Sequence, residues 1–324
     1  MKRALILAPL LAIAFSFASC SSSDTPDFPT VITLGGAEIY PTIVNTSLAV
    51  GQNRVSMSII DRDDNKVLDA AMHVRYYNLN GKRPKFLSEA DARFIPLTLS
   101  YVDEQSNKET SPSGDAGVYV SYADFDEPGD WGVEIAITRA GKQLKPTPFR
   151  FNVLDKTAEP AIGDPAPASV QMITANVSSI EEIDSSFPPR PAMHDMTVAD
   201  AIRSGKPTVI AFATPAFCRS RTCAPVMDTV MDPLAARYRG RVNFVHVEPY
   251  ILRDLRQANI QTPVPASREW RLATEPWIFV VDREGKIAAK YEGIMAEDEV
   301  DSALAIALDT GPASVTPAPS PASN

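Results

Sequence analysis

The sequence predicts two folded domains, an all-β antiparallel sandwich over residues 30–155 and an α/β domain over residues 193–309. Short stretches in which apolar and polar residues alternate recur through the first region. From residue 193 onward, apolar runs alternate with helix signals instead. A segment rich in Pro, Ala and Ser at 156–192 lies between the two regions and is expected to be a linker. The 324 residues are enough for two domains.

The N-terminus has the pattern of a secretory signal. A short basic start precedes an apolar run at 4–17, which is shorter than a transmembrane helix and is followed by small residues. Cys20 at the exit of this run makes the segment resemble a bacterial lipoprotein signal, in which the cysteine is acylated and becomes the mature N-terminus. We therefore expect a lipoprotein signal at 1–20 and a polar tether at 21–29. A plain signal with an incidental cysteine is the alternative.

A lipoprotein signal implies an extracytoplasmic chain of the cell envelope, held on the membrane by its lipid. Disulfides persist in such compartments, and once Cys20 is acylated only Cys218 and Cys223 remain of the three cysteines. Loss of Lys2 and Arg3 leaves 29 of the 31 basic residues against 40 acidic ones, a net charge of −11. So acidic a chain, without a basic run, is not expected to bind nucleic acid.

The strands of the first domain are expected where apolar and polar residues alternate. These stretches are 55–59, 72–76, 95–101, 117–121, 131–137 and 149–153. The stretch from Tyr119 through Pro128, Gly129 and Trp131 resembles Ig-like domains of other bacterial secreted proteins. Tyr119 and Trp131 are expected in the core, because a sandwich needs large inward side chains. No catalytic constellation occurs in this half, so we expect a spacer or a binding module.

The second domain begins with a helix signal. Thr197 and Asp200 have the spacing of a helix N-cap and its acidic partner. The continuous apolar run 207–213 predicts a strand that is buried on both faces. The remaining predicted elements are a helix at 225–238, a strand at 241–247, a helix at 250–258, a strand at 277–281, a hairpin into 286–291 and a closing helix at 296–308. A Pro-rich, low-complexity tail at 310–324 is expected to be disordered.

This order of elements over 193–309 resembles thioredoxin. The strand 208–213 leading to Cys218 is similar to the first core strand of thioredoxin-like proteins, which ends just before the redox cysteine. Glu275-Pro276-Trp277, followed by an apolar strand, is similar to their second hallmark, a cis-proline before a strand. The resemblance implies that Pro276 is cis and faces the cysteine pair. It also implies thiol and disulfide partners among envelope proteins, and no cofactor.

The cysteine spacing departs from the Cys-x-x-Cys of thioredoxins, because four residues separate Cys218 from Cys223. On a regular helix their Cα atoms would be roughly 8.7 Å apart, whereas a disulfide needs less than about 7 Å. Pro225 is favoured at a helix start, which places Cys223 beside the helix N-terminus and Cys218 in the preceding loop. The helix dipole, aided by Arg219 and Arg221, is then expected to lower the pKa of Cys223.

A second departure concerns proton transfer. Thioredoxins place a buried acid just before the strand Phe, where this chain has Ala211. His246 and Glu248, at the end of the next strand, are candidates for the missing relay. For His246 the alternative is a packed strand-end histidine without a catalytic role.

Four functions are open at this point. The first is a thiol–disulfide oxidoreductase with Cys218, Cys223 and Pro276 as catalytic residues. The second is a peroxiredoxin-like peroxidase, since one peroxiredoxin group uses Cys-x4-Cys and Ser220 supplies a hydroxyl three residues before Cys223. A Sco-type copper chaperone is the third, because the run 193–196 (Met-His-Asp-Met) has ligands that suit Cu(I). The fourth is a redox-silent binding protein with a structural disulfide. We expect the first, and no bound metal.

Overall fold

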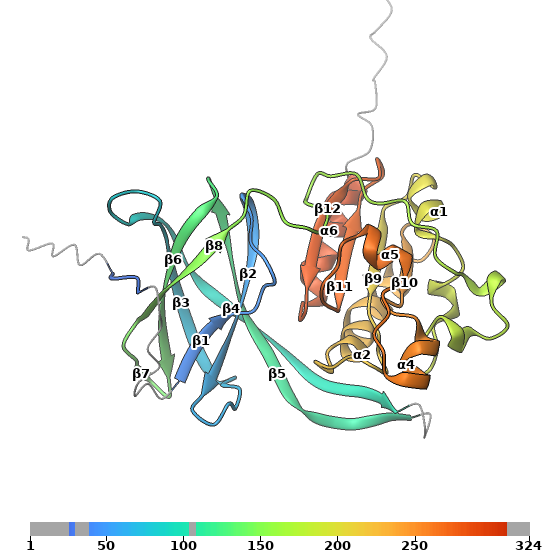
Figure 1. Ribbon diagram of the computed structural model, residues 1–324, viewed down its shortest axis with the longest axis horizontal. Coiled ribbons are helices and arrows are strands. Elements are labelled where there is room, and N and C mark those ends of the chain that lie inside the picture. Colours follow the sequence, from blue (N-terminus) through green and yellow to red (C-terminus); the bar gives the residue numbers. More distant parts are fainter. Residues whose placement is uncertain (1–25, 30–38, 104–107, 310–324) are drawn as a thin grey trace, which may run out of the picture.

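The computed structural model describes residues 26–29, 39–103 and 108–309. The predicted signal with Cys20, most of the tether, the start of the first domain and the tail lie outside the described residues. Within the described ranges, no helix is both long enough and apolar enough to cross a membrane. The chain forms a strand-rich lobe and an α/β lobe that lie side by side (Figure 1).

Eight strands make up the strand-rich lobe. They are β1 (Ile39–Ile43), β2 (Gly51–Asp61), β3 (Ala70–Asn78), β4 (Lys85–Asp103), β5 (Lys108–Phe125), β6 (Gly129–Arg139), β7 (Lys142–Gln143) and β8 (Thr147–Val153). Their order is β1-β2-β5-β4-β3-β6-β7, and β8 also pairs with β6. β4 belongs to both halves of this path, since its first part pairs with β3 and its second part with β5. A bridge between Ala49 and Leu154 brings the two ends of the sheet together.

The strand-rich prediction is confirmed, but the sheet differs from the predicted sandwich of short strands. β4 and β5 have 19 and 18 residues, and the shared β4 makes the sheet continuous. Trp131 and Tyr119 lie in the core as predicted, with exposed fractions of 0 % and 1 %. The Trp131 indole donates a hydrogen bond of 3.0 Å to the Glu127 carbonyl, so its one polar atom is satisfied despite burial.

The second lobe is built around a four-stranded sheet with the order β10-β9-β11-β12. Its strands are β9 (Thr208–Phe212), β10 (Asn243–Val247), β11 (Trp277–Val281) and β12 (Ile287–Glu292). β10 is parallel to β9, whereas β11 is antiparallel to both β9 and β12. Along the chain, the strands and the helices between them follow the order β-α-β-α-β-β-α from β9 to α6, as the sequence predicted. All five residues of β9 are buried, which confirms the predicted burial on both faces.

Helices cover both faces of this sheet. They are α1 (Val198–Arg203), α2 (Cys223–Val226), the π-helix η4 (Met227–Met231), α3 (Asp232–Arg237), α4 (Leu252–Ala258), α5 (Pro265–Glu269) and α6 (Glu297–Asp309). Val209 and Ala211 pack into one core with η4 and α6, whereas Ile210 and Phe212 face the other core with Trp270. The helix predicted at 225–238 is three consecutive helical segments, and it starts at Cys223 rather than at Pro225.

The segment 156–192, expected as a linker, packs along the second lobe. Backbone hydrogen bonds join Gly163 and Asp164 to Ile287 of β12, at 2.8 and 2.9 Å. Ala166 is buried in the core on one face of the sheet. Two short 3-10 helices, η1 (Thr174–Asn176) and η2 (Ile180–Glu182), precede a third, η3 (Pro191–Met193). Prolines in this segment suit its irregular backbone, which is held by tertiary contacts rather than by a regular element.

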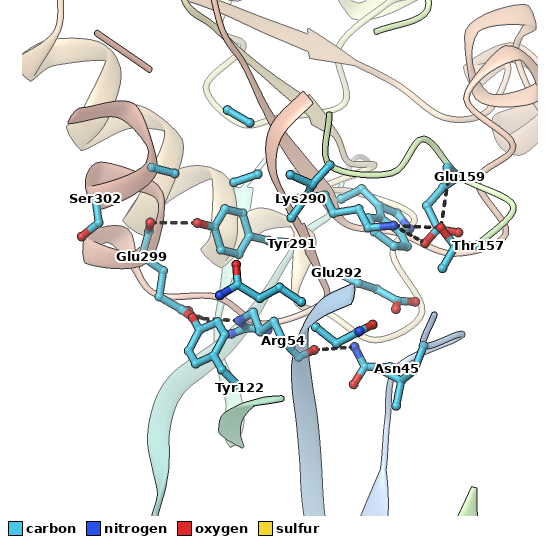
Figure 2. A pocket seen from close by; sticks show the side chains of 18 of the residues that line it. Asn45, Arg54, Tyr122, Thr157, Glu159, Lys290, Tyr291, Glu292, Glu299 and Ser302 are labelled. Carbon is cyan, nitrogen blue, oxygen red and sulfur yellow. Dashed lines mark hydrogen bonds and ion pairs between the residues drawn. The ribbon is translucent and has the colours of Figure 1, made fainter. Parts of the chain in front are cut away.

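Charged side chains join the two lobes (Figure 2). Arg54 of β2 makes a two-pronged pair with Glu299 of α6, at 2.7 and 2.9 Å, and also donates to the Ile294 carbonyl at 3.0 Å. The Tyr122 hydroxyl donates to the same carboxylate at 2.7 Å. Beside this contact, a cavity of about 460 Å³ is lined by residues of both lobes, including Lys290 and Tyr291 of β12. The arrangement of the lobes therefore rests on specific hydrogen bonds as well as on apolar packing.

The β4–β5 hairpin extends beyond its own sheet and lies under the second lobe (Figure 1). Buried side chains of the hairpin, Ile95, Leu97, Leu99, Ala116, Val118 and Val120, cluster with Ile294 of the second lobe. β4 also contacts α2. Because α2 begins at Cys223, the hairpin of the first lobe covers part of the cysteine site.

Candidate active site at the Cys218–Cys223 pair

The two cysteines flank a tight loop between β9 and α2. Cys218 lies in the loop and Cys223 is the first residue of α2, as the spacing predicted. The Arg221 amide donates to the Cys218 carbonyl at 3.0 Å, and Arg221 has a left-handed backbone with φ of 58°. Such a φ is uncommon for a residue other than glycine and is often found at functional sites. This fold-back brings the loop cysteine to the helix cysteine, and both thiols are free.

The Cys218 sulfur is placed to carry negative charge. The nearby Cys223 thiol, the Ser220 hydroxyl and the Cys223 amide lower the pKa of Cys218 to about 6, against the effect of burial. The distance between the Cys218 sulfur and the Ser220 oxygen is 3.1 Å. Hydrogen-bond donors stabilise a thiolate and so lower the pKa of the thiol. Since this pKa lies below 7, Cys218 is mainly a thiolate at neutral pH.

Cys223 has the opposite electrostatic character, which corrects the prediction from the helix dipole. Burial raises its pKa well above the ordinary value, and the neighbouring Cys218 raises it further. A backbone hydrogen bond from Thr214 lowers it only in part. Cys223 has no exposed surface, whereas Cys218 is 6 % exposed. Desolvation of a fully buried group outweighs a helix-end effect that is typically below about 1 kcal/mol.

Pro276 lies at the edge of the same site. β11 pairs with β9 so that Trp277 stands opposite Phe212, which brings Pro276 to the end of β9 where the cysteine loop begins. The Glu275–Pro276 peptide bond is cis, as the resemblance to thioredoxin implied. The strand register therefore places Pro276 at the end of β9 from which the cysteine loop leads, and its role at the site stays a prediction.

A half-buried acid that the sequence did not single out, Glu275, lies close enough to act on the cysteines electrostatically. The Tyr250 hydroxyl donates to Glu275 at 2.6 Å. Burial raises the pKa of Glu275, although the hydrogen bond from Tyr250 and the charge of Arg219 lower it. Its charge in turn acts to raise the pKa of both cysteines. Glu275 was quoted only as the residue before a predicted cis-proline, and only the fold reveals its closeness to the thiols.

The two candidates for a proton relay lie elsewhere. His246 donates from Nε2 to the Ala213 carbonyl at 2.9 Å, and Glu248 accepts from the Ser185 amide at 2.7 Å. Burial raises the pKa of Glu248 to about 8. Among the described residues, neither side chain hydrogen-bonds a cysteine, so neither serves as a direct relay for the pair.

The run 193–196, suggested as a copper ligand set, is divided between core and surface. Met193 is buried in the core beside η4, and Met196 packs against the opposite core. His194 instead meets His246 and Asp184, and these three side chains form a buried group able to hold a metal ion. Sequence reasoning missed Asp184 because it lies in the segment expected to be a linker.

Neither a protein-family model nor a curated protein matches the sequence. Several solved structures match part of this chain, with low sequence identity and low structural similarity. A protein described as a thiol:disulfide interchange protein DsbE, from Chlorobium tepidum, is 18 % identical, with 46 % of this chain and 99 % of that chain covered and a TM-score of 0.30. A thioredoxin-like superfamily protein is 19 % identical, with coverages of 47 % and 99 % and a TM-score of 0.26.

A DUF4426 family protein from Pseudomonas aeruginosa PAO1 is 11 % identical, with coverages of 37 % and 91 % and a TM-score of 0.23. All three TM-scores are low, so the description of the second lobe rests on the order and direction of its own strands.

Proposed function

We propose that this chain is a thiol–disulfide oxidoreductase in which Cys218 attacks and Cys223 resolves. The observation that carries this proposal is the opposite environment of the two thiols. Cys218 is slightly exposed and stabilised as a thiolate, whereas Cys223 is buried and held protonated. A thiolate with some exposed surface, backed by a second thiol close by, is what thiol–disulfide exchange requires.

The reaction in the reducing direction transfers two electrons to the substrate. The Cys218 thiolate attacks one sulfur of a substrate disulfide, and that disulfide breaks as the mixed disulfide forms. The Cys223 thiol then gives its proton to the departing substrate sulfur and attacks Cys218. The Cys218–Cys223 disulfide forms, and the substrate leaves as a dithiol once the thiolate released in the first step has taken a proton from solvent. The oxidising direction is the same sequence in reverse.

The proposed substrates are disulfides or thiols of other cell-envelope proteins. This location rests on the lipoprotein-like signal, whose Cys20 lies outside the described residues. The lipid on Cys20 would hold the chain on the membrane surface, since the mature chain is too acidic for attraction to anionic lipid. We further propose an Ig-like identity for the first lobe, because the sets β1-β2-β5-β4 and β3-β6-β8 reproduce the strand order of that fold.

The geometry supports the peroxidase function less well than the exchange function. It requires Cys223 to be the reactive thiolate, with Ser220 as its hydroxyl partner. Ser220 instead lies beside Cys218, and burial holds Cys223 protonated.

A trapping experiment tests the assignment of the two cysteines. We expect Cys223→Ser, presented with an oxidised protein substrate such as insulin, to accumulate a mixed disulfide at Cys218, because the resolving thiol is absent. Cys218→Ser is the matched control and is expected to trap nothing. The readout is intact mass followed by peptide mapping under non-reducing conditions. Trapping on Cys223 in the Cys218→Ser variant would reverse the assignment, and trapping in neither variant would count against exchange chemistry.

A further inference from the structure

The buried group formed by Asp184, His194 and His246 has the geometry of a metal site. Asp184 follows η2, His194 follows η3, and His246 lies in β10. The facing nitrogens of His194 (Nε2) and His246 (Nδ1) are 3.2 Å apart. His194 Nε2 lies 3.4 Å from Asp184 Oδ2, and His246 Nδ1 lies 3.6 Å from Asp184 Oδ1. Both separations are those of ion pairs, so the two imidazoles and the carboxylate form one buried polar cluster.

The His194–His246 and His194–Asp184 separations of 3.2 and 3.4 Å are close to the spacing of ligands around a tetrahedral ion, and one ligand atom from each residue lies within 4.8 Å of the other two. Ligands bound to Zn²⁺ at 2.0–2.1 Å in a tetrahedron lie roughly 3.3–3.4 Å from one another. The three side chains have exposed fractions of 1 % or less. Imidazole nitrogen and carboxylate oxygen are both ordinary ligands of zinc and similar divalent ions.

Backbone groups next to the cluster hold its side chains in place through hydrogen bonds. The Ala213 carbonyl accepts a hydrogen bond from Nε2 of His246, which leaves a lone pair on Nδ1 directed at the cluster. The Ser186 and Arg190 amides donate to the two Asp184 oxygens at 2.8 and 2.6 Å. Outer partners of this kind hold ligands of metal sites in place and set the histidine tautomer.

A cavity reaches the cluster from outside. It measures about 610 Å³, and His194, His246 and Glu248 line it. The rest of the lining is mixed: α4 contributes Leu252, Arg253, Arg256 and Gln257, and the start of α5 contributes Pro265 and Ala266. Glu248 is 6 % exposed; its Oε1 atom accepts from the Ser185 amide, and the Thr214 hydroxyl lies near its carboxylate.

We propose that Asp184, His194 and His246 bind one divalent transition-metal ion of the zinc type, with the remaining coordination position open to this cavity. Three protein ligands and one open position is the arrangement of zinc sites that bind water or substrate. Glu248 would then accept a hydrogen bond from the water in the open position. The site is separate from the cysteine pair and goes beyond the proposed exchange reaction.

Zinc binding by the purified chain tests this proposal. We use the Cys218→Ser/Cys223→Ser double variant, so that thiolates do not contribute, and measure bound Zn²⁺ by equilibrium dialysis. We expect one ion per chain, and His194→Gln to weaken binding by more than about 100-fold, since loss of an outer partner alone costs 10–100-fold. His73→Gln is the matched control: it removes the one histidine outside the cluster, which lies at the surface beside Asp91, and leaves the affinity unchanged.

A thermal measurement guards against variants that do not fold. The double variant with its cluster intact is expected to unfold at a higher temperature as Zn²⁺ is added, because an ion bound only to the folded state stabilises it. The proposed metal site would be overturned if the double variant bound no Zn²⁺ in dialysis and its unfolding temperature did not rise with added Zn²⁺. Equal affinity in a folded His194→Gln variant would also overturn it. Either result leaves the trapping outcome, and hence the proposed redox function, untouched.

Discussion

Alkylation of Cys218 by iodoacetamide is expected to reach half its maximal rate near pH 6. The Cys223 thiol and Ser220 lower the pKa of Cys218 to about 6 from the ordinary 9.0. The thiolate is the reactive form, so the rate rises as pH passes 6 and levels off above 7. At pH 7 about 90 % of Cys218 is thiolate, against about 1 % for an unperturbed thiol.

The pH at which the alkylation rate is half-maximal, rather than the rate itself, reports the pKa of Cys218. A thiolate of lower pKa is also a weaker nucleophile, by roughly 20-fold over three pH units, and this cancels most of the gain in thiolate. The measurement is a pH series of timed alkylation with peptide mapping, which separates the cysteines. Ser220→Ala should move the midpoint upward, because it removes one donor to the sulfur. A midpoint near pH 9 in the unsubstituted chain would contradict the thiolate assignment.

Arg54→Ala is expected to have the largest effect on stability among single changes at the contact between the lobes. The Arg54 and Glu299 side chains are 8 % and 6 % exposed. Removing one partner of a buried pair leaves the other charge without compensation and typically costs about 3–5 kcal/mol. We expect a loss of this order in the free energy of unfolding, measured by urea denaturation.

Arg93→Ala is the matched control for this change. Arg93 also joins the lobes, through Asp298 at 2.8 Å, but the two side chains are 55 % and 64 % exposed. Exposed pairs contribute about 0–1 kcal/mol, so the control should lose little. Equal losses for the two variants would show that burial does not govern this contact.

The fold of the second lobe could be predicted because its signals are local. The strand 208–212 is apolar at nearly every position, which is typical of a strand covered on both faces, and it is buried throughout. The cap at Thr197 is formed, with the Asp200 amide donating to its side chain at 3.0 Å. By contrast, the lengths of β4 and β5 depend on packing against the other lobe. Alternation within a single stretch contains no information on such a contact.

The electrostatics of the site could not be predicted for the same reason. Proximity to a helix start suggested a low pKa for Cys223, but its complete burial is a tertiary property and has the larger effect. The donors around Cys218 depend on the fold-back at Arg221. Likewise, Asp184 meets the two histidines only because an irregular segment packs on the sheet. The residue types of these sites were visible in the sequence, whereas their burial and partners were not.

The reduction potential of the Cys218–Cys223 couple tests the exchange function most directly. It is measured on the purified chain equilibrated in glutathione buffers of graded ratio, with thiols counted by mass tagging. Stabilisation of the Cys218 thiolate favours the reduced pair and should give a potential between roughly −120 and −270 mV, the range of exchange-active proteins. A couple that stays oxidised down to roughly −300 mV would be a structural disulfide and would contradict the proposed function.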